Sequence, residues 1–175
     1  HNFGIVNAIR SVFLNNRATG NGGGIFNDGG TITVDASTFD GNRTGAGLGT
    51  GGGISNNTGT LVVQSALFSN NFGFDGGAIY VGTSSSADIR GTAIISNSAA
   101  YGGGIESSGT LTVTNSTISR NEAVNIGGGI WLLDGKASVR GTTIHGNKAF
   151  EGGGIYNMSN VAGLVSFRDV TISNN

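Results

Sequence analysis

The side chains in this sequence that could do chemistry are ten carboxylates, two histidines and nine lysines and arginines, spread over 175 residues. Cleavage of a glycosidic bond needs two carboxylates that face each other across a cleft, and a lyase needs a base near its acidic groups. The carboxylates fall at different positions of the repeat described below, and few recur in neighbouring repeats. They are Asp28, Asp35, Asp40, Asp75, Asp88, Glu106, Glu122, Asp134, Glu151 and Asp169. We therefore predict no catalytic residue and keep a polysaccharide-cleaving enzyme as the alternative.

The basic residues contain one recurring pattern. Arg90, Arg140 and Arg168 stand at the same position of the repeat, and the last two come from neighbouring repeats. This pair could bind an acidic sugar or simply lie solvated on an outer face. The net charge of −1 and the charged fraction of 11% exclude the broad basic field that attracts nucleic acid or an anionic membrane.

The composition also limits metal and cofactor chemistry. The chain has no cysteine, which excludes disulfides, thiolate metal ligands and thiol nucleophiles. No short run supplies the six to eight oxygen ligands, approximately, that calcium takes. The longest apolar run is too short to span a bilayer. We expect no metal, no cofactor and no membrane-spanning segment.

A tetrad organises the rest of the chain. Gly-Gly-Gly-Ile occurs at residues 22–25, 51–54, 102–105, 127–130 and 152–155, and Gly-Gly-Ala-Ile occurs at 76–79. The six isoleucines are 25 to 29 residues apart, and a fixed period of this length is typical of repeat proteins. The glycines suit a tight corner; a smooth face on which another rod docks is the alternative.

A second marker lies between the tetrads: an aromatic residue or isoleucine, two variable residues, then asparagine. Asparagine suits a corner because it tolerates left-handed backbone, and stacked amides can bond to one another. We therefore predict a structural ladder, with a ligand-binding or glycan-bearing row as the alternative. Its members are Asn16, Asn42, Asn71, Asn97, Asn121, Asn147 and Asn175.

The residues before each asparagine marker alternate between apolar and mostly polar types, which predicts a β-strand. In the fourth tetrad's repeat, Leu111 and Val113 face inward and Thr112 faces outward. One repeat buries too few apolar groups to offset the entropy of ordering it, so the repeats must stack. We predict an all-β, single-stranded, right-handed parallel β-helix of about seven coils of ~25 residues, one domain over residues 1–175.

These repeats resemble the right-handed parallel β-helix repeats of bacterial surface and secreted proteins, including polymorphic outer-membrane-protein-like and adhesin-like chains. The resemblance covers nearly the whole chain and is closest over residues 109–121, Gly-Thr-Leu-Thr-Val-Thr-Asn-Ser-Thr-Ile-Ser-Arg-Asn. It implies an extracellular or cell-surface location and a longer parent protein. The third glycine of the tetrad departs from the shorter Gly-Gly-Ala-Ile form.

One outward position is unusually aromatic. Phe26, Tyr80, Trp131 and Tyr156 each follow a tetrad isoleucine, whereas Ser55 and Glu106 hold this position in the other repeats. Exposed aromatic strips bind carbohydrate or protein partners. The alternative is that these rings only shield the neighbouring glycines.

Asn-x-Ser/Thr sequons begin at Asn42, Asn56, Asn115 and Asn157. Asn42 belongs to the predicted ladder, so Asn56 and Asn157 are the better candidates for glycosylation.

The two ends suggest how the chain is used. Gly4-Ile5 echoes the end of a tetrad, and residues 172–175 finish on an asparagine marker in phase for another coil. Solenoid ends normally carry polar caps. We therefore expect either a segment of a longer β-helix or a subunit that stacks head-to-tail on copies of itself. The predicted function is a non-enzymatic extracellular stalk, filament or adhesive module, with carbohydrate as a further partner and no nucleic-acid partner.

Overall fold

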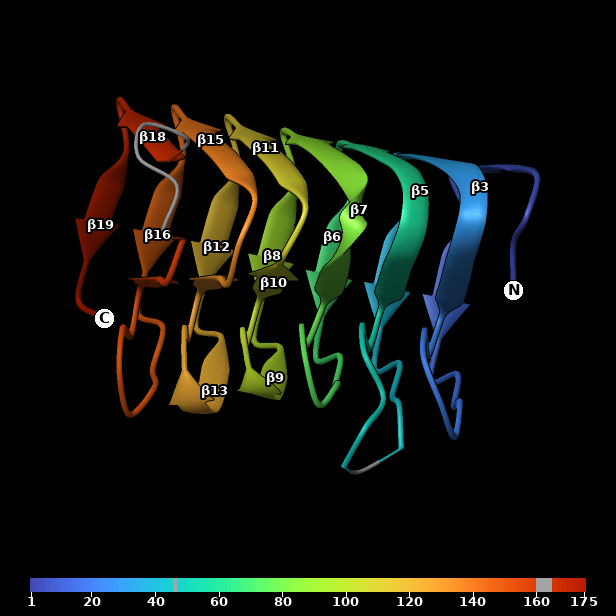
Figure 1. The fold of residues 1–175 in the computed structure, drawn as a ribbon, viewed down its shortest axis with the longest axis horizontal. Helices are drawn as coiled ribbons and strands as arrows, with labels where there is room; N and C mark the ends of the chain where they lie inside the picture. Colours follow the sequence, from blue (N-terminus) through green and yellow to red (C-terminus); the bar gives the residue numbers. More distant parts are fainter. Residues whose placement is uncertain (46, 160–164) are drawn as a thin grey trace.

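The computed structural model describes residues 1–45, 47–159 and 165–175, and it contains only strands, turns and loops over those residues. The coils stack along one long axis, with the two termini at opposite ends (Figure 1). The strands are β1 (Ile5–Ile9), β2 (Val12–Leu14), β3 (Ile25–Asp35), β4 (Thr38–Asp40), β5 (Ile54–Gln64), β6 (Leu67–Ser69), β7 (Ile79–Arg90), β8 (Ala93–Ile95), β9 (Ser98–Tyr101), β10 (Ile105–Ser107), β11 (Thr110–Thr114), β12 (Thr117–Ser119), β13 (Glu122–Ile126), β14 (Ile130–Leu132), β15 (Lys136–Arg140), β16 (Thr143–His145), β17 (Ile155–Asn157), β18 (Val165–Arg168) and β19 (Thr171–Ser173).

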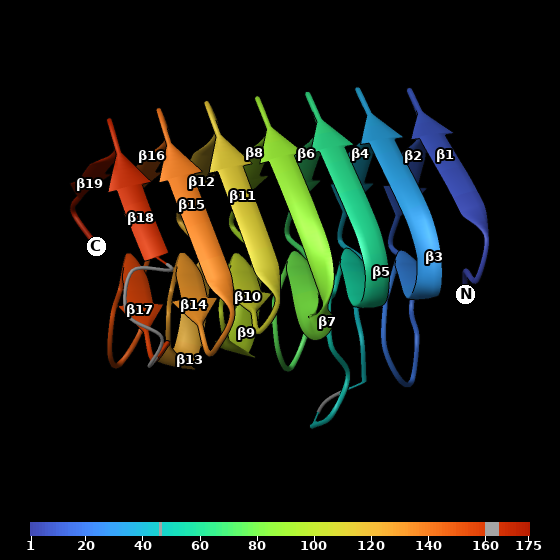
Figure 2. The same cartoon turned by 45° about the horizontal axis from the view of Figure 1, so that its top comes forward.

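Each strand pairs in parallel with the equivalent strand one repeat away. The largest sheet runs β1-β3-β5-β7-β10-β14-β17, with β11, β15 and β18 continuing the face that β7 begins (Figure 2). A second sheet of seven strands runs β19-β16-β12-β8-β6-β4-β2, and β9 pairs with β13 in a third. The result is an all-β parallel solenoid of about six turns of ~26 residues, which confirms the predicted class.

The core consists of the inward columns that the alternation predicted. Leu111 and Val113 are buried in β11, and their partners Ala137 and Val139 are buried in β15. Near the N-terminal end, the rings of Phe13, Phe39 and Phe68 stack at centroid distances of 4.4 and 4.7 Å. Later coils continue this column with isoleucine. Burial of such a side chain contributes about 1.5–3 kcal/mol, so stability accumulates along the stack rather than within one coil.

The predicted asparagine ladder is confirmed from Asn16 to Asn175. In each step the side-chain Nδ2 donates to Oδ1 of the next asparagine over 2.7–3.0 Å. The backbone N–H donates to the same Oδ1 over 2.9–3.1 Å. Nδ2 also donates to a main-chain carbonyl of the preceding coil, as Asn97 does to Phe68. The ladder therefore satisfies buried backbone groups at a corner and links the coils.

Two further polar columns were missed in the sequence. Nδ2 of Asn2 donates to Oδ1 of Asn27 over 2.8 Å, and Nδ2 of Asn27 donates to Oδ1 of Asn56 over 2.7 Å. At another corner, the backbone N–H of Thr92 donates to the hydroxyl of Ser116 over 3.2 Å. The signals were Ile-x-Asn at the first two tetrads and a hydroxyl two residues before most asparagine markers.

The tetrad glycines form the predicted corner. The first glycine has positive φ, as at Gly102 with φ of 61°, a region that glycine occupies at little cost. The second lies against the next coil: a Cβ on Gly103 would come within 2.5 Å of the carbonyl oxygen of Gly128. The corner therefore needs glycine for both backbone angle and close approach.

The predicted equivalence of Gly4-Ile5 to a tetrad is wrong. Ile5 pairs with Thr31 and points outward, so it does not share the column of Ile25. The bridge between Asn2 and Asn27 and the hydrogen bond from Thr31 N to Gly4 O set this register. Hydrogen bonding to the next coil therefore overrides the local sequence likeness.

Candidate interaction surfaces

Two outward columns face each other across the glycine corner. One precedes the first glycine and the other follows the tetrad isoleucine, and across the corner the hydroxyls of Thr50 and Ser55 lie 2.7 Å apart. We call these columns the corner seam. Its first column holds Thr50, Asp75, Tyr101, Ile126 and Glu151; its second holds Phe26, Ser55, Tyr80, Glu106, Trp131 and Tyr156.

The predicted aromatic residues do share one column, but they do not form one open strip. Trp131 is only 9% exposed, and the ring of Tyr101 lies 5.0 Å from its ring. Trp131 also lies close to Gly127, where an added Cβ would come within 2.6 Å of the Trp131 Cβ. The prediction of Trp131 as an exposed binding residue is therefore wrong, because its side chain is buried. Phe26, Tyr80 and Tyr156 are half-buried, and their binding role stays a prediction.

Glu106 is the most unusual residue of the seam. Its side chain lies in register between Tyr80 and Trp131 and is 3% exposed. Oε1 accepts a hydrogen bond from Ser108 Oγ over 3.3 Å, whereas Oε2 has no partner among the described residues. Burial, and then the nearby charge of Asp75, raise the pKa of Glu106 to about 8. The carboxyl group is therefore mostly neutral at pH 7.

The pKa values of Asp75 and Tyr80 are also raised. Burial raises the pKa of Asp75. Burial, followed by the charges of Glu106 and Asp75, raises the pKa of Tyr80. Sequence reasoning treated Glu106 only as an interruption of the aromatic column. The sequence did carry a signal for Glu106: a carboxylate stands at a position of the repeat that holds an aromatic residue in four other repeats.

Two carboxyl groups with raised pKa values are the elements of acid–base catalysis. Here Glu106 is too buried to reach a polymeric substrate. The groups that shift the pKa of either carboxyl include no arginine or lysine. Within the described part of the chain, no three histidine, aspartate or glutamate side chains gather as a metal site would require. Glu106 is therefore a buried carboxyl group whose one hydrogen bond among the described residues, to Ser108, lies within its own coil.

The glycosylation prediction needs one correction. Asn56 is fully buried, and its Nδ2 donates to the carbonyl of Ser86 over 3.0 Å. It belongs to the second amide column, so a glycan cannot be attached there. Asn157 is exposed and stays the candidate.

The two ends of the asparagine ladder are chemically complementary. Oδ1 of Asn16 accepts no hydrogen bond from any described residue, and the backbone N–H of Asn175 donates to none. The inward side chains of the last coil are more exposed than those of the coil before it. Phe167 is 45% exposed and Ile172 is 52% exposed, whereas their partners Val139 and Ile144 are buried. Within the described chain, the ladder therefore leaves the amide oxygen of Asn16 without a donor at one end and the backbone N–H of Asn175 without an acceptor at the other.

Comparison with known proteins supports the same class. Residues 2–149 match the family model for the right-handed β-helix region, so the chain belongs to the right-handed β-helix family. This confirms the predicted fold and its handedness. The finer resemblance to adhesin-like and polymorphic outer-membrane-protein-like chains stays a prediction. No match was found among curated proteins or among solved structures. Over the described residues, no helix is long and apolar enough to cross a membrane.

Proposed function

We propose that this β-helix is a non-enzymatic structural module that works as a rod in an extracellular or cell-surface protein. The rod continues by end-to-end stacking, either onto further coils of a longer chain or onto a second copy. It acts as a stalk, a filament subunit or the shaft of an adhesive protein.

The single observation that carries this proposal is the uniform direction of the asparagine ladder along the rod. In every internal step the earlier coil donates and the later coil accepts. A further coil, in the same chain or in a second copy, would continue this pattern by accepting from Asn175, whose Nδ2 would exchange its bond to Ser173 O for the new amide oxygen. Parallel strand edges add main-chain hydrogen bonds, and burial of Phe167 and Ile172 adds an apolar contribution. A head-to-tail contact that does not close into a ring grows a filament.

The test uses residues 1–175, light scattering and negative-stain microscopy. We expect rods longer than the roughly 30 Å of one unit, taken as six coil spacings. Ile172→Lys places a charge in the open inward column and should leave single units. Thr171→Lys adds the same charge on the neighbouring outward position and should leave rods. A well-folded single unit at high concentration, without rods, would contradict stacking between copies.

Carbohydrate binding or cleavage is the second candidate, favoured by Asp75 beside Tyr80 in the seam. It predicts retention of the chain on a polysaccharide column and loss of that retention in Tyr80→Ala. Cleavage would further require new reducing ends to appear and to disappear in Asp75→Asn. If the chain does not bind the column, this candidate fails.

A further inference from the structure

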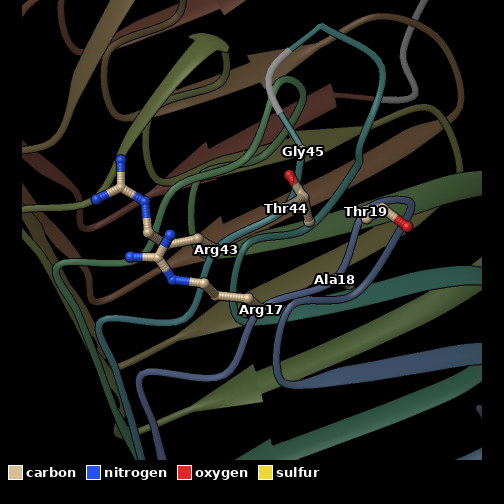
Figure 3. A pocket seen from close by; sticks show the side chains of 6 residues that line it. All are labelled: Arg17, Ala18, Thr19, Arg43, Thr44 and Gly45. Carbon is tan, nitrogen blue, oxygen red and sulfur yellow. The ribbon is translucent and has the colours of Figure 1, made fainter.

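A cavity of about 320 Å³ lies on the loops that lead from β2 to β3 and from β4 to β5. Figure 3 shows its lining, in which Arg17 and Arg43 extend side by side in the same direction. The lining residues are Arg17, Ala18, Thr19, Arg43, Thr44 and Gly45. None of them was singled out by the sequence patterns.

The two arginines are held in register on adjacent coils. Arg17 and Arg43 form a parallel bridge, so their backbones are about 4.8 Å apart. The bridge is flanked by hydrogen bonds from Arg43 N to Asn16 O over 2.8 Å and from Ala18 N to Arg43 O over 3.0 Å. The Arg43 guanidinium also lies 5.1 Å from the ring centroid of Phe72, one coil further along. This cation–π contact fixes the direction of the side chain.

These two charges have no acidic partner among the described residues, where the ion pairs are His1–Asp28, Arg90–Asp88 and Lys148–Glu122. The contrast is clearest within one column. Arg17, Arg43, Phe72, Ser98, Glu122 and Lys148 occupy it in succession. Glu122 and Lys148 pair over 3.8 Å, whereas the arginine pair stays uncompensated. Like charges directly opposite each other repel, so an anion between them would stabilise both.

Two of the other lining residues, Thr44 and Gly45, are already in contact with neighbouring parts of the chain. The Thr44 hydroxyl donates to the carbonyl of Gly49 over 2.8 Å and is buried. Gly45 lies against the preceding coil, since a Cβ there would come within 2.4 Å of the Thr19 carbonyl oxygen. The unused hydrogen-bonding capacity therefore belongs mainly to the guanidinium groups, whose planar forks match carboxylate and sulfate oxygens.

We propose that this cavity binds a carboxylate or sulfate group carried on a body the size of a sugar ring. The volume stands at the lower end of the range for small-molecule sites, about 300–1,000 Å³, and a bare inorganic anion fills only part of it. This site is separate from the corner seam and lies on the first two coils of the rod, where Arg17 and Arg43 directly follow the ladder residues Asn16 and Asn42. An acidic saccharide on a cell surface is the kind of partner it fits.

The test is calorimetric titration of the whole chain with three probes: a sulfated uronic-acid disaccharide, a neutral disaccharide of the same size, and inorganic phosphate. The variant Arg17→Gln/Arg43→Gln should bind the acidic disaccharide about tenfold or more weakly, because charge-assisted hydrogen bonds are lost. Arg17→Lys/Arg43→Lys keeps both charges but loses the planar guanidinium groups that can donate two parallel hydrogen bonds. Its affinity for the acidic disaccharide should lie between those of the parent and the double glutamine variant.

The matched control is Arg140→Gln/Arg168→Gln. These arginines also lie in register on adjacent coils and are exposed, but they do not line this cavity. Unchanged binding in this control supports the proposal, provided that the circular-dichroism spectra of all variants agree. An equal loss in the control would overturn it by showing a general effect of charge. Equal binding of the neutral disaccharide, phosphate binding as tight as that of the acidic disaccharide, or no saturable binding would each overturn it as well.

Discussion

Glu106 and Trp131 lie in register on adjacent coils, and both are buried with a polar atom that has no hydrogen-bond partner among the described residues. These atoms are Oε2 of Glu106 and Nε1 of Trp131. An unpaired buried polar group costs about 1–3 kcal/mol. The seam therefore holds a protonated carboxyl group at a position where a charge would be far more costly. This relationship has a direct consequence for stability at different pH values.

Stability should fall as the pH rises from about 4.5 to about 8. Over this range the folded chain keeps a proton on Glu106 whose pKa is about 8, whereas the unfolded chain has released it. The unfolded state then binds fewer protons, so the free energy of unfolding decreases by up to about 1.4 kcal/mol per pH unit. Above pH 8 the effect levels off. Burial raises the pKa of Asp75 as well, so this group contributes in the same direction.

The measurement is urea denaturation at several pH values. Glu106→Gln keeps the shape of the side chain and removes its titration, so its stability should depend less on pH than that of the parent. It should also exceed the parent's stability near pH 8. Parallel curves for the two proteins would show that Glu106 does not titrate in this window.

Val113→Asp should abolish cooperative folding or cost more than about 4 kcal/mol, because it buries an unpaired charge in the continuous core. Thr112→Asp, one residue earlier on the outward face, should cost about 1 kcal/mol or less, including repulsion from Asp88 on the neighbouring coil. Thermal denaturation followed by circular dichroism distinguishes them. Equal losses in the two variants would contradict the assignment of inward and outward columns.

Asn97→Ala should destabilise the chain by about 2–5 kcal/mol, since it removes the acceptor for two donors of Asn71 and leaves the buried backbone N–H of Asn71 unpaired. Asn7→Ala is the matched control because Asn7 is exposed on the outward face of β1. Chemical denaturation measures both. A cost for Asn97→Ala no larger than that of its control would show that the ladder contributes little.

Gly103→Ala should be among the most damaging single substitutions, with a cost above about 3 kcal/mol. Its Cβ would come within 2.5 Å of the Gly128 carbonyl oxygen and 2.6 Å of the Glu122 carbonyl carbon, neither of which can move without breaking the coil register. Gly20→Ala has open space around the new methyl group and should be neutral or slightly stabilising. Comparable melting temperatures for both variants would refute the close-approach explanation of the corner.

Much of the fold was predictable from local sequence. Alternation of side chains placed Val113 inside and Thr112 outside, because a strand turns successive side chains to opposite faces whatever surrounds it. The recurrence of asparagine predicted the ladder, because equal coil lengths bring equal positions into contact. The same reasoning failed at the N-terminal end, because the first coil does not keep the spacing of the later ones. There, hydrogen bonds to the next coil place Ile5 opposite Thr31 and outside the tetrad column.

The candidate surfaces were less predictable. The burial of Asn56 depended on amide partners on the coils either side, and the covering of Trp131 depended on a ring from the opposite column of the seam. Arg17 and Arg43 each follow a ladder asparagine, so their register could have been read from the sequence, but the loop paths that form a cavity beside them could not. Their alignment follows from main-chain hydrogen bonds between the coils.

The sequence by itself determined the period, the inward columns and the asparagine ladder, because each depends on spacing along one coil. Only the tertiary structure decided which columns face each other across the glycine corner, and hence that Asp75 raises the pKa of Glu106 and that Tyr101 covers Trp131. It also decided that two arginines of adjacent coils line one cavity. The physical reason is that the path of each loop and the angle of each corner are set by hydrogen bonds to neighbouring coils, which leave no periodic trace in the sequence.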